Sequence, residues 1–205
     1  MITIIDYGAG NLFSMQNALN YLGFENRISS KEEDIRSADK LILPGVGAFP
    51  DAMERLDNFG LTETIKEEAG RKPLLGVCLG MQILFQWGSE FKKTAGLGLI
   101  PGKVDLITAP GLKIPHMGWN DLRVVNPCPL AEGVKAGDMV YFVHSYKAIT
   151  DEKYICLAAD YGGGIPALVT DGNGLVYGAQ FHPEKSGGVG LNILKNFAEL
   201  GGRLE

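Results

Sequence analysis

The chain has 205 residues, of which 45% are hydrophobic and 21% are charged, and its formal net charge is -5. This composition is typical of an ordinary globular protein. The sequence shows no stripe of basic residues, which argues against a nucleic-acid partner. No stretch is apolar over the roughly 20 residues that a membrane span needs, and the first residues do not resemble a signal peptide, so we expect a cytoplasmic protein that does not bind membranes.

The first half of the chain alternates apolar strands with amphipathic segments. Short buried strands are predicted at residues 2–6, 40–43 and 73–77. Helices are predicted at residues 12–22 and 80–87, and a polar amphipathic stretch covers 48–69. Asn11 is the expected N-cap of the first helix, and Gly23 is its expected stop. This alternation predicts a mainly parallel sheet with helices on both faces.

The second half is rich in short β-type runs punctuated by Gly, Pro and Asn. Strands are predicted at residues 103–107, 122–125, 139–143, 154–159, 167–170 and 175–180. The Asp-Gly-Asn-Gly segment at 171–174 predicts a hairpin, and apolar residues at 191, 194, 197 and 198 predict a closing helix. We therefore expect an α/β fold with one domain over residues 1–205. Its single open, mainly parallel twisted sheet would carry additional antiparallel strands.

Three cysteines are present, at positions 78, 128 and 156. The odd count without close spacing argues against a disulfide framework or a zinc site, so we expect no metal. Cys128 lies between two prolines and is predicted in a turn, whereas Cys156 lies in an apolar run and is predicted in the core. Only Cys78 has neighbours that suggest chemistry.

Cys78 is the centre of the segment Gly-Val-Cys-Leu-Gly at residues 76–80. A predicted strand leads directly into a predicted helix there, as in the nucleophile elbows of G-x-S-x-G enzymes. The flanking glycines remove side chains that would clash at a sharp turn. The N-terminus of the following helix favours a thiolate. These five residues alone are equally compatible with a buried structural cysteine at a strand end.

A second group of candidate residues is His182 and Glu184, separated by Pro183. The imidazole could take the proton of a thiol and later protonate a leaving amine. The carboxylate, two residues further on, could accept the other imidazole N–H and fix its tautomer. Taken alone, the pair resembles a surface His-Pro turn. Together with Cys78 it supplies a nucleophile, a base and an orienting group.

Two glycine-containing loops follow predicted strands. Pro-Gly-Val-Gly at 44–47 could direct backbone N–H groups at an oxyanion, although an ordinary turn would have the same composition. Gly8 and Gly10 follow the first strand as in a dinucleotide-binding fingerprint. The third glycine of that fingerprint would fall at Phe13, and no acidic residue is well placed, so we expect no cofactor.

Gly-Val-Cys-Leu-Gly-Met-Gln at 76–82 together with Phe-His-Pro-Glu at 181–184 resembles the class I, triad-type glutamine amidotransferases. Further segments resemble one group in that family, the glutaminase subunits of imidazole glycerol phosphate synthase. They lie at residues 6–12, 44–49, 115–120 and 141–146. Lys185 and Ser186 continue the last motif as in that group. The resemblance covers essentially the whole chain.

The resemblance implies that Cys78 attacks the side-chain amide of glutamine and that His182, supported by Glu184, protonates the departing ammonia. Water would then hydrolyse the thioester. Glutamine would be bound by Gly45, Gly47, Leu79, Gln82, Ser145 and Tyr146. The oxyanion donors would be the backbone N–H groups of Val46 and Leu79, provided that the Gly45–Val46 peptide turns inward. Without the family match, Gln82 would be interpreted as a solvated helix residue and Tyr146 as a core aromatic.

The partner implied by the resemblance is a (β/α)₈ cyclase that receives the ammonia and makes imidazole glycerol phosphate and an aminoimidazole carboxamide ribotide. The positions that face it would be Asn11, Trp119, Tyr141 and Lys185. From its neighbours alone, Trp119 is equally compatible with a half-buried core residue.

Three alternatives stay open at this point. The chain could be the glutaminase of another synthase, such as that for anthranilate or pyridoxal phosphate. It could be a binding subunit that keeps the fold without the chemistry, or a cysteine hydrolase acting on a peptide or ester.

Overall fold

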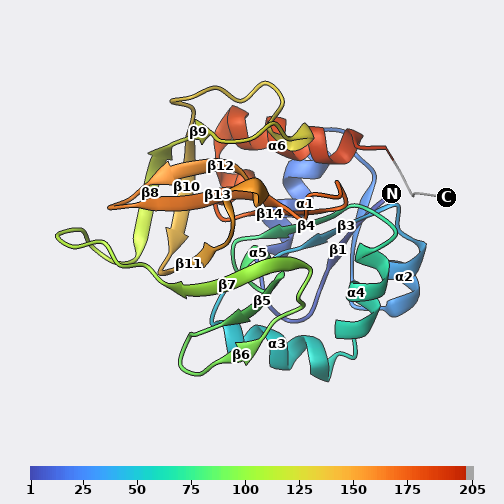
Figure 1. Ribbon diagram of the computed structural model, residues 1–205. Coiled ribbons are helices and arrows are strands. Elements are labelled where there is room, and N and C mark those ends of the chain that lie inside the picture. The colour runs from blue at the N-terminus through green and yellow to red at the C-terminus, as the bar shows by residue number, and fades with distance from the viewer. Residues whose placement is uncertain (202–205) are drawn as a thin grey trace.

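A computed structural model describes residues 1–201, and its main feature is an eight-stranded sheet (Figure 1). In spatial order its strands are β2 (Asn26–Ser29), β1 (Ile2–Ile5), β3 (Lys40–Leu43), β4 (Leu74–Val77), β14 (Val176–Ala179), β13 (Gly164–Thr170), β12 (Ile155–Asp160) and β9 (Arg123–Val124). The first five strands are parallel to one another. The last three pair in antiparallel fashion.

Helices cover both faces of the parallel part of the sheet. On one face lie α1 (Leu12–Tyr21) and α6 (Gly187–Glu199), and on the other lie α2 (Glu32–Ser37), α3 (Phe49–Asn58) and α4 (Thr62–Ala69). Alternate residues of a strand point to opposite faces, so each apolar strand contributes to two cores. In β3, Ile42 packs into the core under α1 and α6, whereas Leu41 and Leu43 pack under the other helices.

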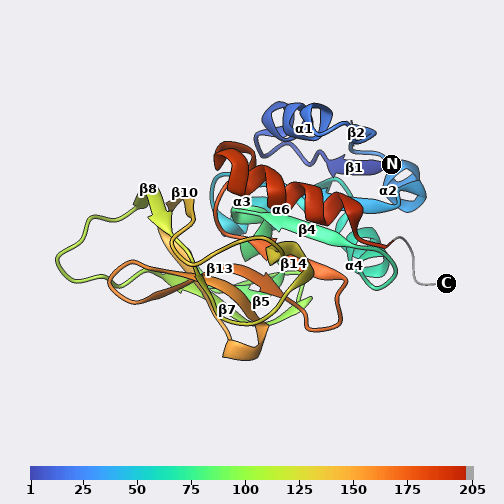
Figure 2. The same ribbon diagram turned by 90° about the horizontal axis from the view of Figure 1, so that it is seen from above.

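Two smaller sheets extend the molecule at the end remote from the two termini (Figure 2). One pairs β10 (Met139–His144) with β8 (His116–Asp121). The other has the order β11 (Tyr146–Ile149), β7 (Ile100–Leu106), β5 (Phe85–Gly88) and β6 (Thr94–Ala95). The remaining elements are α5 (Leu79–Gln82) and the 3₁₀ turns η1 (Pro129–Ala131), η2 (Glu152–Tyr154) and η3 (Pro183–Lys185).

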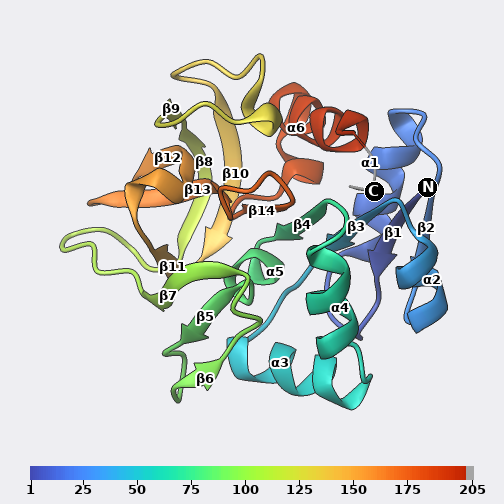
Figure 3. The ribbon, with the colours of Figure 1, turned by 45° about the vertical axis from the view of Figure 1, so that its right-hand side comes forward.

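The topology brings distant parts of the chain together at one edge of the sheet. Strands β3, β4 and β14 are parallel neighbours, so their carboxyl ends meet at this edge (Figure 3). The backbone N–H of Cys78, directly after β4, donates to the carbonyl of Ala179, the last residue of β14, at 2.7 Å. The segments that follow β4 and β14, which carry Cys78 and His182, therefore start side by side.

The predicted α/β fold with a mainly parallel sheet is confirmed. The hairpin at 171–174 joins the antiparallel strands β13 and β14, and Cys156 is buried as predicted. Asn11 stands at the N-cap of α1, but its side chain makes no capping hydrogen bond. Among residues 1–201 there is no helix with the length and apolar character that crossing a bilayer requires.

One predicted helix is wrong in its second half. The helix expected at 80–87 ends at Gln82, and residues 85–88 form strand β5 instead. The run between them is apolar and buried, and such a run fits a buried helix or a buried strand equally well. Pairing with β6 and β7 decides the outcome. Strands β2, β6, β8 and β11 and helix α2 were not predicted.

Candidate active site

The nucleophile candidate, Cys78, stands at a strained corner between β4 and α5. Its φ of 55° and ψ of -111° lie in a region that non-glycine residues rarely adopt. A Cβ on Gly76 would lie 2.6 Å from the carbonyl oxygen of Gly80. A Cβ on Gly80 would lie 1.8 Å from the carbonyl oxygen of Leu43. Both flanking glycines are therefore required by close backbone packing, as the motif suggested.

His182 faces this corner from the loop after β14. Its Nδ1 and the Glu184 Oε1 are 2.9 Å apart, and the two side chains are only 4% and 2% exposed. Because a carboxylate can only accept, Nδ1 carries a proton. Nε2 is the ring nitrogen that remains available to the thiol of Cys78. Within the described residues neither His182 Nε2 nor Glu184 Oε2 has a hydrogen-bond partner. The thiol Sγ lies 3.9 Å from the carbonyl oxygen of Val143.

The charge of His182 is set by opposing effects. Burial disfavours the imidazolium, but the neighbouring Cys78 and Glu184 outweigh burial and raise the pKa of His182 to about 9. A protonated imidazole beside a sulfur nucleophile is the state that can later donate a proton to a leaving amine.

A short network holds the histidine loop against β10. The backbone N–H of His182 donates to the carbonyl of Tyr141 at 3.0 Å. The hydroxyl of Ser186 donates to the His182 carbonyl at 2.6 Å and accepts from the Tyr141 N–H at 2.9 Å. The imidazole thus has a fixed direction of approach to Cys78.

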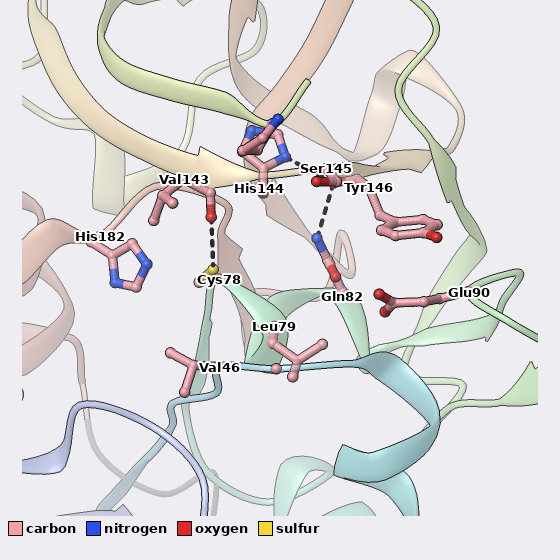
Figure 4. A pocket seen from close by; sticks show the side chains of 12 residues that line it. Val46, Cys78, Leu79, Gln82, Glu90, Val143, His144, Ser145, Tyr146 and His182 are labelled. Atoms are coloured by element: carbon pink, nitrogen blue, oxygen red, sulfur yellow. Dashed lines mark hydrogen bonds between the residues drawn. The ribbon is translucent and has the colours of Figure 1, made fainter. Parts of the chain in front are cut away.

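A cavity of about 370 Å³ opens over the corner (Figure 4). Of the residues predicted for the site, those that line it are Val46, Gly47, Cys78, Leu79, Gln82, Ser145, Tyr146 and His182. Glu184 is not in the lining, but its side chain contacts His182, which is. Gly45 lies beneath it, where a Cβ would lie 2.6 Å from Tyr7 Oη and 2.8 Å from the Gly80 nitrogen. The structure therefore brings together residues from four separate segments of the chain.

Gln82 is buried and does not behave as a solvated helix residue. Its Nε2 donates to the carbonyl of Tyr146 at 3.0 Å and to Gln180 Oε1 at 3.1 Å. Both amide hydrogens are therefore used within the protein. The amide oxygen is the part of Gln82 that stays available to a ligand in the cavity.

With this geometry in place, comparison with known proteins identifies the family. Residues 3–200 match the sequence profile of "Glutamine amidotransferase class-I". The chain belongs to this family.

Two relatives are about half identical to this amidotransferase. "Imidazole glycerol phosphate synthase subunit HisH" of Listeria monocytogenes serotype 4b (strain CLIP80459) is 50% identical over 202 residues, which cover 98% of this chain and 96% of the relative. The protein of the same name from Bacillus cereus (strain G9842) is 51% identical over 198 residues, which cover 96% and 93%.

Solved structures agree in fold. A crystal structure titled as a glutamine amidotransferase has a TM-score of 0.73 and 23% identity, and covers 96% of this chain and 99% of its own. PurLQS from Thermotoga maritima has a TM-score of 0.75 and 22% identity, and covers 96% of both chains.

Several residues of the amidotransferase cavity were not predicted from the sequence. They are Glu90, Pro115, Val143 and His144. Glu90 follows β5, and its Oε2 accepts the backbone N–H of Phe49 at the start of α3, at 2.7 Å. Its carboxylate lies near the Tyr146 ring (Figure 4). No spacing in the sequence points to Glu90, because it reaches the site through a loop whose path depends on β5.

The residues predicted to face a partner lie on neighbouring elements. Trp119 of β8 is 53% exposed, which excludes a core position, and its ring meets that of Tyr141 edge-on at 6.1 Å. Tyr141 of β10 contacts the loop that carries His182, and Lys185 is exposed on η3 in the same loop. Asn11 precedes α1, which packs against η3. Trp119, Tyr141 and Lys185 are therefore connected through the loop that carries His182, and Asn11 lies at the start of a helix that packs against η3.

Proposed function

We propose that this chain is the glutaminase subunit of an imidazole glycerol phosphate synthase, releasing ammonia from glutamine for histidine biosynthesis. The observation that carries the proposal is the strained Cys78 beside a His182–Glu184 pair in a cavity of about 370 Å³. The full-length similarity to proteins named as HisH subunits supports this synthase over those for anthranilate or pyridoxal phosphate.

The proposed reaction uses three side chains in sequence. The Cys78 sulfur attacks the side-chain amide carbon of glutamine and forms a covalent tetrahedral intermediate. When that intermediate collapses, the C–N bond breaks, and the His182 imidazolium gives its proton to the nitrogen, which leaves as ammonia. His182, now acting as a base, takes a proton from water, which attacks the thioester. The products are glutamate and the regenerated thiol of Cys78. Glu184 keeps the proton of Nδ1 in place throughout.

Glutamine would be recognised by groups that converge on the cavity. The proposed oxyanion donors are the backbone N–H groups of Val46 and Leu79, and the backbone of Gly47, Ser145 and Tyr146 would contact the rest of the substrate. Among the residues known to line the cavity, Glu90 contributes a carboxylate. We assign Glu90 and the free amide oxygen of Gln82 as acceptors for the α-ammonium group.

The proposed partner is a (β/α)₈ cyclase bound at the surface formed by Asn11, Trp119, Tyr141 and Lys185. This surface supports the proposal because it adjoins the loop that carries His182. We propose a cytosolic location, in keeping with this biosynthetic role. Cell fractionation tests it.

The decisive experiment is ammonia release from glutamine by the chain with and without the cyclase and its ligand. We expect strong release by the complex and weak release by the chain alone, because an oxyanion donor from the Gly45–Val46 peptide would be supplied only in the complex. One such donor is worth about 10²–10³ in rate. Cys78→Ala should abolish release while binding of the cyclase persists. No release by the wild-type complex would overturn the proposed function. Full activity of the isolated chain would overturn the idea that the oxyanion donor is supplied only in the complex.

A further inference from the structure

Two buried histidines join the outer strand β8 to the wall of the cavity. His116 of β8 and His144 of β10 lie opposite each other in the ladder, and His116 Nδ1 is 3.0 Å from His144 Nε2. On the outer side, Asn120 Nδ2 is 3.2 Å from His116 Nε2. On the inner side, His144 Nδ1 is 2.8 Å from the carbonyl oxygen of Tyr146 (Figure 4).

The direction of every hydrogen bond in this series is fixed from both ends. The Tyr146 carbonyl can only accept, so His144 carries its proton on Nδ1 and leaves Nε2 bare. His144 Nε2 must then accept from His116 Nδ1–H, which leaves His116 Nε2 bare as well.

The outer end gives the same answer independently. Asn120 Nδ2 also donates to the Asp160 carbonyl at 2.8 Å, and its Oδ1 accepts the backbone N–H of Asp121 at 2.9 Å. The amide therefore cannot be flipped without losing both contacts, and it presents an N–H to His116 Nε2. Both rings are neutral Nδ1–H tautomers.

The surroundings keep these rings neutral and in place. His116 is stacked between the rings of Phe142 and Tyr161, with centroid distances of 4.5 and 4.1 Å. Burial lowers the pKa of His116 and of His144 to about 4. Charging either ring would place two N–H groups against each other with no acceptor between them, at the Asn120–His116 contact for His116 and at the His116–His144 contact for His144.

At the inner end of the series, His144 contacts a residue that lines the cavity, Tyr146. The Tyr146 carbonyl accepts from His144 and from Gln82 Nε2 at the same time. The orientation of this carbonyl therefore fixes the Gln82 amide, and it fixes which atom of Gln82 faces the cavity.

We propose that Asn120, His116 and His144 are positioning residues that hold the Tyr146 carbonyl, and through it Gln82, in the orientation that binds glutamine. This inference rests on the proposed function for the identity of the substrate. None of the three side chains is required to touch the reacting atoms, so their effect should fall on KM for glutamine more than on kcat.

The first test is ¹⁵N NMR of the histidine rings in the wild-type chain, which has only three histidines. Protonated and bare ring nitrogens have well-separated shifts. At pH 7 we expect two neutral rings, each with a proton on Nδ1. A proton on Nε2 of either His116 or His144 would overturn the proposal, whether or not the chain hydrolyses glutamine.

The second test compares two replacements of His144 in the complex with the cyclase. Asn can place an amide N–H near the position of Nδ1, whereas Gln places its amide near the position of Nε2. We expect His144→Gln to raise KM for glutamine about 5- to 10-fold, the worth of one hydrogen bond, and His144→Asn to recover most of that loss. Equal KM values in both variants, or a loss confined to kcat, would contradict the positioning role.

Asn120→Asp extends the test to the outer end of the series. A carboxylate would accept from His116 Nε2 and so reverse the tautomer of the ring. We expect the NMR signal of His116 to show a protonated Nε2 and KM to rise by a similar factor. An unchanged tautomer with an unchanged KM would count against the proposal. Absence of glutamine hydrolysis in the wild-type complex would instead refute the proposed function and leave the tautomer result standing.

Discussion

The backbone of Cys78 adopts a conformation that costs a non-glycine residue on the order of 1–3 kcal/mol. The surrounding packing maintains it, because Gly76, Gly80 and Gly45 let three backbone segments approach more closely than any side chain would permit. Tyr7 adds to this support by donating from its hydroxyl to the Pro44 carbonyl at 2.9 Å. The strain exposes the sulfur to the cavity, where the imidazole can reach it.

Glu184 sets the tautomer of His182 and, together with Cys78, raises its pKa, which gives a prediction for pH dependence. His182 must be protonated to release ammonia, so kcat/KM should fall as pH rises through its pKa of about 9. Glu184→Gln removes one of the two neighbours that raise this pKa, so the alkaline limb should move to lower pH. The rate should also drop by about 10²-fold or more.

The pH–rate profile of the complex checks this prediction. Glu199→Gln, on the exposed end of α6, is the matched control and should leave the profile unchanged. An alkaline limb at the same pH in Glu184→Gln would contradict the role given to this carboxylate.

At the scale of elements, a buried ion pair joins α2 and α4. Lys72 is fully buried, and its Nζ lies 2.6 Å from Glu68 Oε2. The same ammonium donates to the carbonyls of Ile35 and Arg36 in the last turn of α2, at 3.1 and 2.7 Å. A cation at this position satisfies carbonyls that the helix leaves without partners.

Removing one member of this pair should be costly. We expect Lys72→Met to lower the free energy of unfolding by about 1–3 kcal/mol, because the buried carbonyls of Ile35 and Arg36 lose their donor. Glu68 would keep only its 3.3 Å contacts with Arg36 and Arg71. Combining it with Glu68→Gln should recover part of the loss. Lys66→Met, which breaks the exposed Lys66–Glu63 pair, should have little effect. Urea unfolding measures all three, and equal effects of the Lys72 and Lys66 changes would contradict this account.

Elements were predictable from sequence where the local signal was strong. The apolar strands at the start of the chain and α6 show clear periodicity, and Cys78 and His182 stand in recognisable motifs. Residues 26–37 form β2 and α2 from polar, partly exposed sequence, so no hydrophobic pattern marked them. Glu90 and His144 enter the cavity because of how β5 and β10 pack, and that packing is a tertiary effect that local sequence does not encode.

At the scale of the whole molecule, the two buried neutral histidines make stability depend on acidity. An imidazole has a usual pKa of 6.5, and burial lowers that of His116 and His144 to about 4 in the folded chain. Between these values the unfolded chain binds more protons, so stability falls as pH decreases from 6.5 to 4. His182, whose pKa is raised to about 9, opposes this trend slightly between pH 7 and 6, where the folded chain binds more protons, and adds nothing well below 6.5, where it is protonated in both states.

The corresponding measurement is the urea midpoint at pH 7, 6, 5 and 4. We expect a loss on the order of 3 kcal/mol for each ring over this range, in addition to the contribution of carboxylates. In His116→Gln the slope should be shallower than in the wild type. An identical slope in both proteins would show that His116 is not held neutral by the fold.

The central claim is that Cys78 is the nucleophile that attacks glutamine, and its most direct test is covalent labelling. The complex with the cyclase is treated with an electrophilic glutamine analogue, and the modified residue is mapped by mass spectrometry. We predict a single label on Cys78, prevented by excess glutamine, with Cys128 and Cys156 unmodified as internal controls. A label on either of those cysteines, or glutamine hydrolysis that continues after Cys78 is fully labelled, would contradict the account.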